Sequence, residues 1–159
     1  PSNSQCIHAE GMKPQGPQGS CGPNEVWSYG DKIEPMLSAI VRFRNEILSP
    51  YILELGKNVS TLGVPTLRPL WYEFPTDAMA SDSKCEDQFL LGPKYLAAPV
   101  TVHGAVSRSV YFPGDATVGW KEVVPMGGKE GVVHAGGERK VIEAPLSKLP
   151  LYERVLIQQ

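Results

Sequence analysis

The chain has 159 residues, which is room for one ordinary domain or two small ones and excludes a complete (β/α)8 barrel of about 250 residues. Its hydrophobic fraction of 42% is typical of a packed protein and excludes wholesale disorder. Fifteen Lys and Arg residues against seventeen Asp and Glu residues give a net charge of −2, so the chain has no overall positive field to hold nucleic acid or anionic lipid.

The sequence contains no membrane or secretion signal. No stretch approaches the roughly 20 apolar residues of a spanning helix. The first residues carry neither the basic start nor the apolar run of a signal peptide. We therefore expect no membrane and no nucleic-acid partner, while the cellular compartment stays open. The chain starts at Pro1, and both of its ends resemble cuts in a longer polypeptide, so we expect a fragment.

The first 24 residues predict a loop, because Gly and Pro alternate there with Gln and no periodicity is present. A helix follows over 31–62, where apolar residues recur at steps of three and four. Pro50 lies inside this pattern and predicts a kink or a break near Leu48–Ser49. Gly63 is expected to end the helix.

After Pro65 the pattern changes to short apolar runs that predict strands. The runs are 67–74, 89–91, 95–102, 109–112, 120–124, 132–134 and 139–142. The Gly136-Gly137 pair between the last two runs predicts a hairpin. Strands at roughly 10-residue spacing indicate half a β-sandwich, so the fold class is α+β, with a boundary near Pro65.

The three cysteines, Cys6, Cys21 and Cys85, leave the redox state open. Cys6 and Cys21 could bridge in a secreted protein, and the alternative is three free thiols. These cysteines and His8 lack the paired spacing of a zinc site, so no metal and no cofactor are expected. The triplet that starts at Asn58 fits the N-glycosylation pattern, and whether it is used also stays open.

Three stretches together carry a family resemblance. They are GPNEVWSYGD (22–31) followed by RFRNEILSPYI (42–52), GVPTLRPLWYEFPTD (63–77), and EDQFLLGPKYLAAPV (86–100) with VYFP (110–113) after it. In this order and spacing they resemble glycoside hydrolase family 31, the retaining α-glucosidase and α-xylosidase family. The end of the chain, APLSKLPLYERV (144–155), resembles the closing strand of that family's sandwich.

The resemblance implies a division of the chain. Residues 1–64 would form the C-terminal end of a (β/α)8 catalytic barrel, with its last loop and a kinked last helix. Residues 65–159 would form the proximal C-terminal domain, an antiparallel β-sandwich. The division agrees with the change in periodicity near Pro65.

The resemblance also implies a function in carbohydrate metabolism. The parent protein would be a retaining α-glycosidase that hydrolyses α-glucosidic or α-xylosidic bonds through two carboxyl groups. The family's nucleophile and acid/base lie upstream of the matching region, so no catalytic residue is expected here and this chain alone would be inactive. Its partners would be the α-glycoside substrate and the remainder of the catalytic domain, in the same polypeptide or as another chain.

His8 is the one candidate substrate-binding residue. In the family, a histidine in the loop after the last barrel strand donates hydrogen bonds to the sugar, and His8 occupies roughly that place. The family pattern is Phe-Arg-X-His-Gly, and here Cys6 stands at the Arg position and Ala9 at the Gly position. The alternative is a solvated histidine in a loop.

The remaining polar candidates have structural interpretations. Trp27 and Tyr29 are expected to anchor a loop, and Arg68 is expected to form an ion pair between the barrel and the sandwich. The local carboxylates, with ordinary capping or solvated roles, are Glu25, Asp31, Glu73, Asp77, Glu86 and Asp87.

Two other functions stay open. The chain could be a non-catalytic β-sandwich module that binds carbohydrate or protein, or a degenerate homologue without hydrolase activity. The sequence leaves open the sugar, the linkage, the oligomeric state, and hydrolysis as against a lyase step.

Overall fold

The structure, a computed structural model, describes residues 26–125 and 131–157. It combines helices with antiparallel sheets, which confirms the α+β class. Two compact units divide the chain, one up to Ser38 and a larger one from Ala39 onward. In the described ranges, no helix has both the length and the apolar character needed to cross a membrane.

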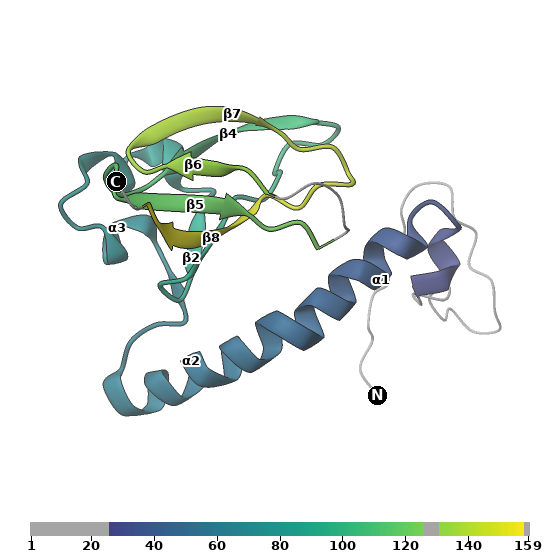
Figure 1. Cartoon of the computed structure of the whole chain (residues 1–159), viewed down its shortest axis with the longest axis horizontal. Coiled ribbons are helices and arrows are strands. Elements are labelled where there is room, and N and C mark those ends of the chain that lie inside the picture. Colours follow the sequence, from purple (N-terminus) through teal and green to yellow (C-terminus); the bar gives the residue numbers. More distant parts are fainter. Residues whose placement is uncertain (1–25, 126–130, 158–159) are drawn as a thin grey trace, which may run out of the picture. The chain divides into compact units, whose positions relative to one another are not determined.

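The first described elements are helical (Figure 1). A 3-10 turn, η1 (Val26–Tyr29), precedes α1 (Glu34–Phe43), a π-helical segment η2 (Arg44–Leu48), and α2 (Ser49–Leu62). The expected irregularity near residue 48 therefore takes the form of a π turn that ends where α2 begins. Pro50 lies in the first turn of α2, where a missing N–H costs little. Gly63 ends the helix as predicted, with φ 68° and its N–H bonded to the Val59 carbonyl at 3.0 Å.

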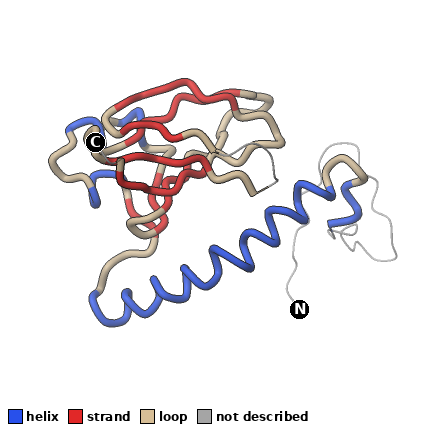
Figure 2. Tube along the Cα trace, viewed as in Figure 1, coloured by secondary structure: helices blue, strands red, loops and turns tan. Residues whose placement is uncertain are grey.

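The strands form two antiparallel sheets (Figures 1 and 2). The larger has the order β1-β2-β3-β8-β5-β6, and the smaller pairs β4 with β7. The strands are β1 (Leu67–Arg68), β2 (Phe89–Leu91), β3 (Tyr95–Ala97), β4 (Ser107–Phe112), β5 (Val118–Glu122), β6 (Val133–Ala135), β7 (Glu138–Glu143) and β8 (Leu151–Leu156). The last strand, β8, thus lies inside the sheet, between β3 and β5.

The hydrophobic core lies between the two sheets. Register places Leu90, Leu96 and Tyr152 opposite one another on one face of the larger sheet, and all three are fully buried. Phe112 of the smaller sheet meets the Tyr152 ring edge-on, with centroids 4.9 Å apart. Trp120 is also fully buried, and its indole N–H donates to the Pro113 carbonyl at 2.9 Å, so its polar atom is satisfied.

The strand predicted over 67–74 is wrong in its second half. Only Leu67–Arg68 is a strand, and α3 (Leu70–Glu73) follows. Leu70 and Phe74 are both buried and are four residues apart, which is the spacing of one helical turn and not the alternation of a strand. Two 3-10 turns, η3 (Ala78–Ser81) and η4 (Ser83–Cys85), follow α3, and β3 is shorter than expected, ending at Ala97.

The predicted hairpin around Gly136-Gly137 is also wrong. β6 pairs with β5 and β7 pairs with β4, so the glycines carry the chain from one sheet to the other. The Gly136 N–H bonds to the Val118 carbonyl and the Gly137 N–H to the Phe112 carbonyl, each at 2.8 Å. A Cβ at Gly136 would lie 2.5 Å from the Asp115 carbonyl oxygen, so the glycine is needed for close backbone approach.

Helix α2 packs on the other face of the larger sheet. The Tyr51 hydroxyl donates to the Leu91 carbonyl at 3.2 Å, and the Tyr51 ring meets Tyr95 edge-on at 5.4 Å. Leu55, one turn further, is 3% exposed. Gly92, between β2 and β3, has φ 57°, and a Cβ there would lie 2.7 and 2.9 Å from the Leu55 methyl groups and would also meet the Tyr51 hydroxyl. The helix and this turn therefore fit only with glycine at residue 92.

We predict that Gly92→Ala destabilises the chain by at least about 2 kcal/mol, because it adds both left-handed backbone strain and overlap with Leu55. Gly104→Ala is the matched control, since Gly104 has φ 74° with no atom within 4 Å of its Cβ position. Urea unfolding followed by circular dichroism measures both. Equal losses in the two variants would show that the contact with α2 contributes nothing.

Candidate functional site

His8, the residue that the sequence predicts to bind the sugar, lies outside the described residues. Cys6, Cys21 and Glu25 lie outside them as well, so their roles stay predictions. Cys85 is described and is a buried free thiol, whose pKa is raised by burial.

Arg68 forms an ion pair, as predicted, but with a neighbour in sequence. Its guanidinium pairs with Glu73 of α3, and its Nε donates to the Pro65 carbonyl at 2.7 Å. It also lies over the Tyr72 ring, 5.4 Å from the centroid. The side chain is 9% exposed, so these contacts satisfy a buried charge. Arg68 therefore holds the segment 65–73 in its bent course, and the expectation that it joins two domains is not met by these contacts.

Asp77 ties the segment after α3 to the smaller sheet. Its carboxylate accepts the Tyr111 hydroxyl at 2.7 Å, the Gly114 N–H at 3.0 Å and the Met79 N–H at 3.1 Å. Burial, followed by this hydrogen bond to a carboxylate, raises the pKa of Tyr111. Asp77 is thus occupied by structural hydrogen bonds.

The other candidate carboxylates also have structural or solvated positions. Asp87 pairs with Arg108 at 2.9 Å, and Glu86 beside it is exposed. Asp31 is exposed in the turn before α1, which begins at Glu34. In the ranges 26–125 and 131–157, no group of three or more His, Cys, Asp or Glu side chains is arranged to hold a metal ion.

A buried polar cluster on β5 and β6 was missed by the sequence reasoning. His134 is 7% exposed, its Nε2 lies 3.2 Å from a Glu122 carboxylate oxygen, and the Lys148 ammonium donates to that oxygen at 2.9 Å. The His134 ring stacks on Phe112 with centroids 4.5 Å apart. Burial disfavours the charged Glu122, but the hydrogen bonds from Lys148 and His134 outweigh it and lower the pKa of Glu122. The cluster forms because β5 and β6 pair in a particular register. Neither strand's sequence alone indicates that register.

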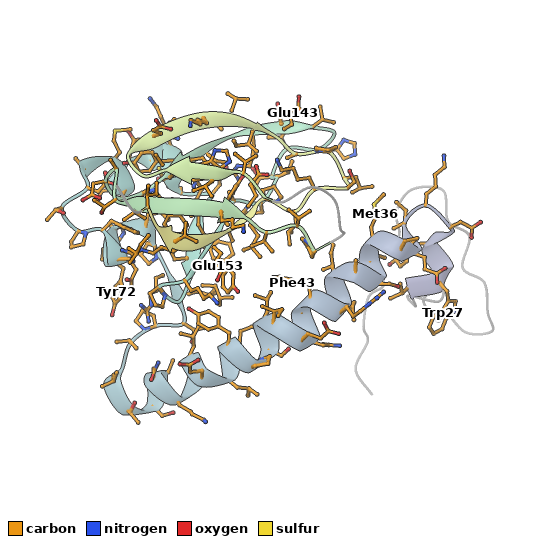
Figure 3. The ribbon with its side chains drawn as sticks, viewed as in Figure 1. Trp27, Met36, Phe43, Tyr72, Glu143 and Glu153 are labelled. Atoms are coloured by element: carbon orange, nitrogen blue, oxygen red, sulfur yellow. The ribbon has the colours of Figure 1, made fainter. Side chains whose placement is uncertain are left out.

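The apolar surface of the helical segment is mostly uncovered. In this fully described segment, α1 and η2 bury no residue and α2 buries only Leu55. The helical side chains, with Met36 and Phe43 labelled, are drawn in Figure 3. The exposed apolar helix residues, between 40% and 71% exposed, are Val41, Ile47, Ile52, Leu53, Val59 and Leu62. An amphipathic helix of this length normally buries its apolar face, so this surface is typical of a docking face.

A second exposed apolar group lies on the larger sheet and α3. Leu67 and Phe89 are 60% and 37% exposed, and Trp71 and Tyr72 are 51% and 38% exposed. Tyr72 projects outward from α3 (Figure 3). Register places Leu67 and Phe89 on the same face of the larger sheet, and large exposed apolar patches mark interaction sites in soluble proteins.

Comparison with known proteins assigns the family. The family model described as "Glycosyl hydrolase family 31 C-terminal domain" matches residues 63–155. The chain belongs to glycoside hydrolase family 31. The resemblance found in the sequence is thereby confirmed.

Relatives of this family 31 chain are named as α-glucosidases. A probable glucan 1,3-alpha-glucosidase of Oryza sativa subsp. japonica is 30% identical over 130 residues, which are 82% of this chain and 13% of the relative. Alpha-glucosidase 2 of Bacillus thermoamyloliquefaciens is 31% identical over 129 residues, which are 80% of this chain and 15% of the relative. The family 31 chain thus spans about one seventh of the length of these curated relatives.

Solved structures of the same family share this architecture. A GH31 α-xylosidase from a soil metagenome, complexed with xylose, superposes with a TM-score of 0.71 at 32% identity and covers 84% of this chain and 18% of its own. The GH31 α-xylosidase of Xanthomonas citri superposes with a TM-score of 0.68 at 33% identity and covers 82% of this chain and 13% of its own.

The polar cluster of the family 31 chain predicts a pH dependence of stability. The folded-state pKa of Glu122 lies below its ordinary value of 4.5, so its stabilisation is complete above about pH 4.5 and is lost as the pH falls through the lower folded value. We predict that Glu122→Gln costs about 1–3 kcal/mol of unfolding free energy at pH 7 and that this cost shrinks below pH 4. Urea unfolding at both pH values measures it.

Glu153→Gln is the control for this experiment. Glu153 pairs with Lys94 at 2.9 Å but is 38% exposed, so its loss should cost under about 1 kcal/mol. A Glu122→Gln cost that stays constant from pH 7 to acid would contradict the assigned role of the Glu122 carboxylate.

Proposed function

We propose that this chain is the C-terminal portion of a retaining α-glycosidase that hydrolyses α-glucosidic or α-xylosidic bonds. Residues 1–64 supply the last loop and last helix of the (β/α)8 catalytic barrel, and residues 65–159 supply the proximal C-terminal β-sandwich. The names of the relatives and of the solved structures support the substrate class. The family match, which starts at residue 63, supports the division.

The exposed apolar helix residues carry this proposal. Ile52 and Val59 are seven residues apart on α2, so they lie on the same side of the helix, and each is about 40% exposed. Burying a side chain of this kind stabilises a protein by roughly 1.5–3 kcal/mol. Several such residues exposed to water on one helix indicate that another protein surface covers them. We propose that this surface is the rest of the barrel, in the same polypeptide or as another chain.

The carboxylates of the described residues bear on where the catalytic pair lies. A retaining glycosidase needs two carboxyl groups about 5–5.5 Å apart, one as nucleophile and one as acid/base. In the described part of the chain, Glu73, Asp77, Asp87 and Glu122 accept hydrogen bonds from cationic, hydroxyl or backbone donors. We assign the nucleophile and acid/base to the upstream barrel, where the family resemblance places them, and propose that His8 of this chain donates hydrogen bonds to the sugar.

We predict that the longer polypeptide carrying these residues hydrolyses an aryl α-glucoside or α-xyloside and releases the α-anomer first, as monitored by NMR. The isolated chain should show no hydrolysis. His8→Ala in the longer polypeptide should lower kcat/KM about 10- to 100-fold, the value of one or two hydrogen bonds to the transition state.

His103→Ala is the matched control, because His103 is exposed in the loop after β3 and should leave kcat/KM unchanged. Hydrolysis by the isolated chain would overturn the assignment of the carboxylates. Saturable sugar binding by the longer polypeptide without any turnover would instead favour a degenerate, binding homologue.

A further inference from the structure

A hollow of about 350 Å³ lies beside strand β4 of the smaller sheet. It is formed by the start of β4, the loop that follows β3, Lys84 of η4, Asp87 after η4, and one residue of β7. This volume lies at the lower end of the range of small-molecule sites. All of its lining residues belong to the larger compact unit.

The charged lining of the hollow is predominantly positive. The lining contains the cations Lys84, Arg108 and Arg139 and a single carboxylate, Asp87. Arg108 is already committed: its guanidinium donates to Asp87 at 2.9 Å, to the Ser109 carbonyl at 3.1 Å and to the Pro99 carbonyl. The Asp87–Arg108 pair therefore cancels, and Lys84 and Arg139 remain as an excess of two positive charges.

Neither remaining cation has a carboxylate partner within the part of the chain that the structure describes. Asp82 accepts the backbone N–H of Lys84 at 2.7 Å, but it is not part of the lining. Two cations that share one hollow repel each other, and an anion between them removes that repulsion.

Arg139 is fixed in position before any ligand arrives. It donates to the Cys85 sulfur at 3.2 Å and to the Lys84 carbonyl at 3.3 Å, and it lies over the Tyr111 ring, 5.4 Å from the centroid. Tyr111 is itself held by Asp77. A guanidinium has five N–H donors in a rigid fork, so these two hydrogen bonds leave donors for a ligand at little conformational cost.

The rest of the lining fits a small oxyanion. The hydroxyls of Ser107 and Ser109 stand at exposed positions on β4 and can donate further hydrogen bonds. The lining also includes the apolar side chains of Pro99, Val100 and Val102, which suit the carbon skeleton of an organic ligand. We propose that this hollow binds a small molecule through a phosphate, sulfate or carboxylate group held between Lys84 and Arg139.

The test is isothermal titration of the full chain at low ionic strength with inorganic phosphate, glucose 6-phosphate, glucuronate and, as the uncharged control, glucose. The phosphates should bind saturably with a Kd near or below about 1 mM, glucose should not bind, and added salt should weaken the binding. Equal affinity for inorganic phosphate and glucose 6-phosphate would identify a free oxyanion as the ligand, and tighter binding of the sugar phosphate an organic one.

Lys84→Gln should weaken phosphate binding about tenfold or more, since a charge-assisted hydrogen bond is lost. Arg139→Lys keeps the charge but loses the fork and should also weaken it. Lys140→Gln is the charge-matched control, because Lys140 lies next to Arg139 on β7 but pairs with Glu138 outside the hollow, and it should change the Kd by less than about twofold.

Lys84 is exposed, so its substitution leaves the fold intact, and circular dichroism verifies this. Absence of saturable binding by every anion would overturn the proposal. An equal loss of affinity in Lys84→Gln and Lys140→Gln would overturn it too, because it would show a general field effect and no site. These binding measurements do not involve hydrolysis, so the proposed anion site can fail or succeed independently of the proposed glycosidase function.

Discussion

The six-stranded sheet carries apolar side chains on both of its faces, and the structure of this chain depends on how each face is covered. On one face, Leu90, Leu96 and Tyr152 stand in register and are sealed by the smaller sheet. On the other, Leu91 and Tyr95 stand in register one residue along the strands and receive helix α2. Because side chains alternate along a strand, burial of both faces requires a layer on each side.

The second layer is incomplete within residues 26–125 and 131–157, the part of the chain that the structure describes. Only Leu55 of the helical segment is buried, and Leu67 and Phe89, which share the helix-facing side of the sheet, stay exposed. Family 31 relatives are about seven times longer than the matched region, so a further body is available in those proteins. The proposed role of the chain, to close a catalytic barrel and to brace it, follows from this unfinished layer. The cationic hollow is lined by the smaller sheet and the loops beside it. The proposal for the hollow therefore does not depend on the incomplete helical layer.

Local features were predictable from the sequence and register was not. The helix end at Gly63 depends on a few neighbouring residues, and the prediction was confirmed. The hairpin at Gly136-Gly137 was wrong because a glycine pair permits a close backbone approach of either kind, and only pairing with β4 and β5 decides between them. The contact of His134 with Glu122 likewise requires two strands in register. The positive charge at the hollow comes from Lys84 and Arg139, which are more than 50 positions apart in the chain. No local sequence pattern indicates that they lie together.

The most direct measurement of the central claim is hydroxyl-radical footprinting of the isolated chain against the longer polypeptide, read residue by residue by mass spectrometry. The account predicts that oxidation of Ile52 and Val59 falls several-fold in the longer polypeptide, while Val141, a residue of β7 that is 76% exposed, is oxidised equally in both. Equal oxidation of Ile52 and Val59 in the two proteins would show that nothing covers the helix and would contradict the account.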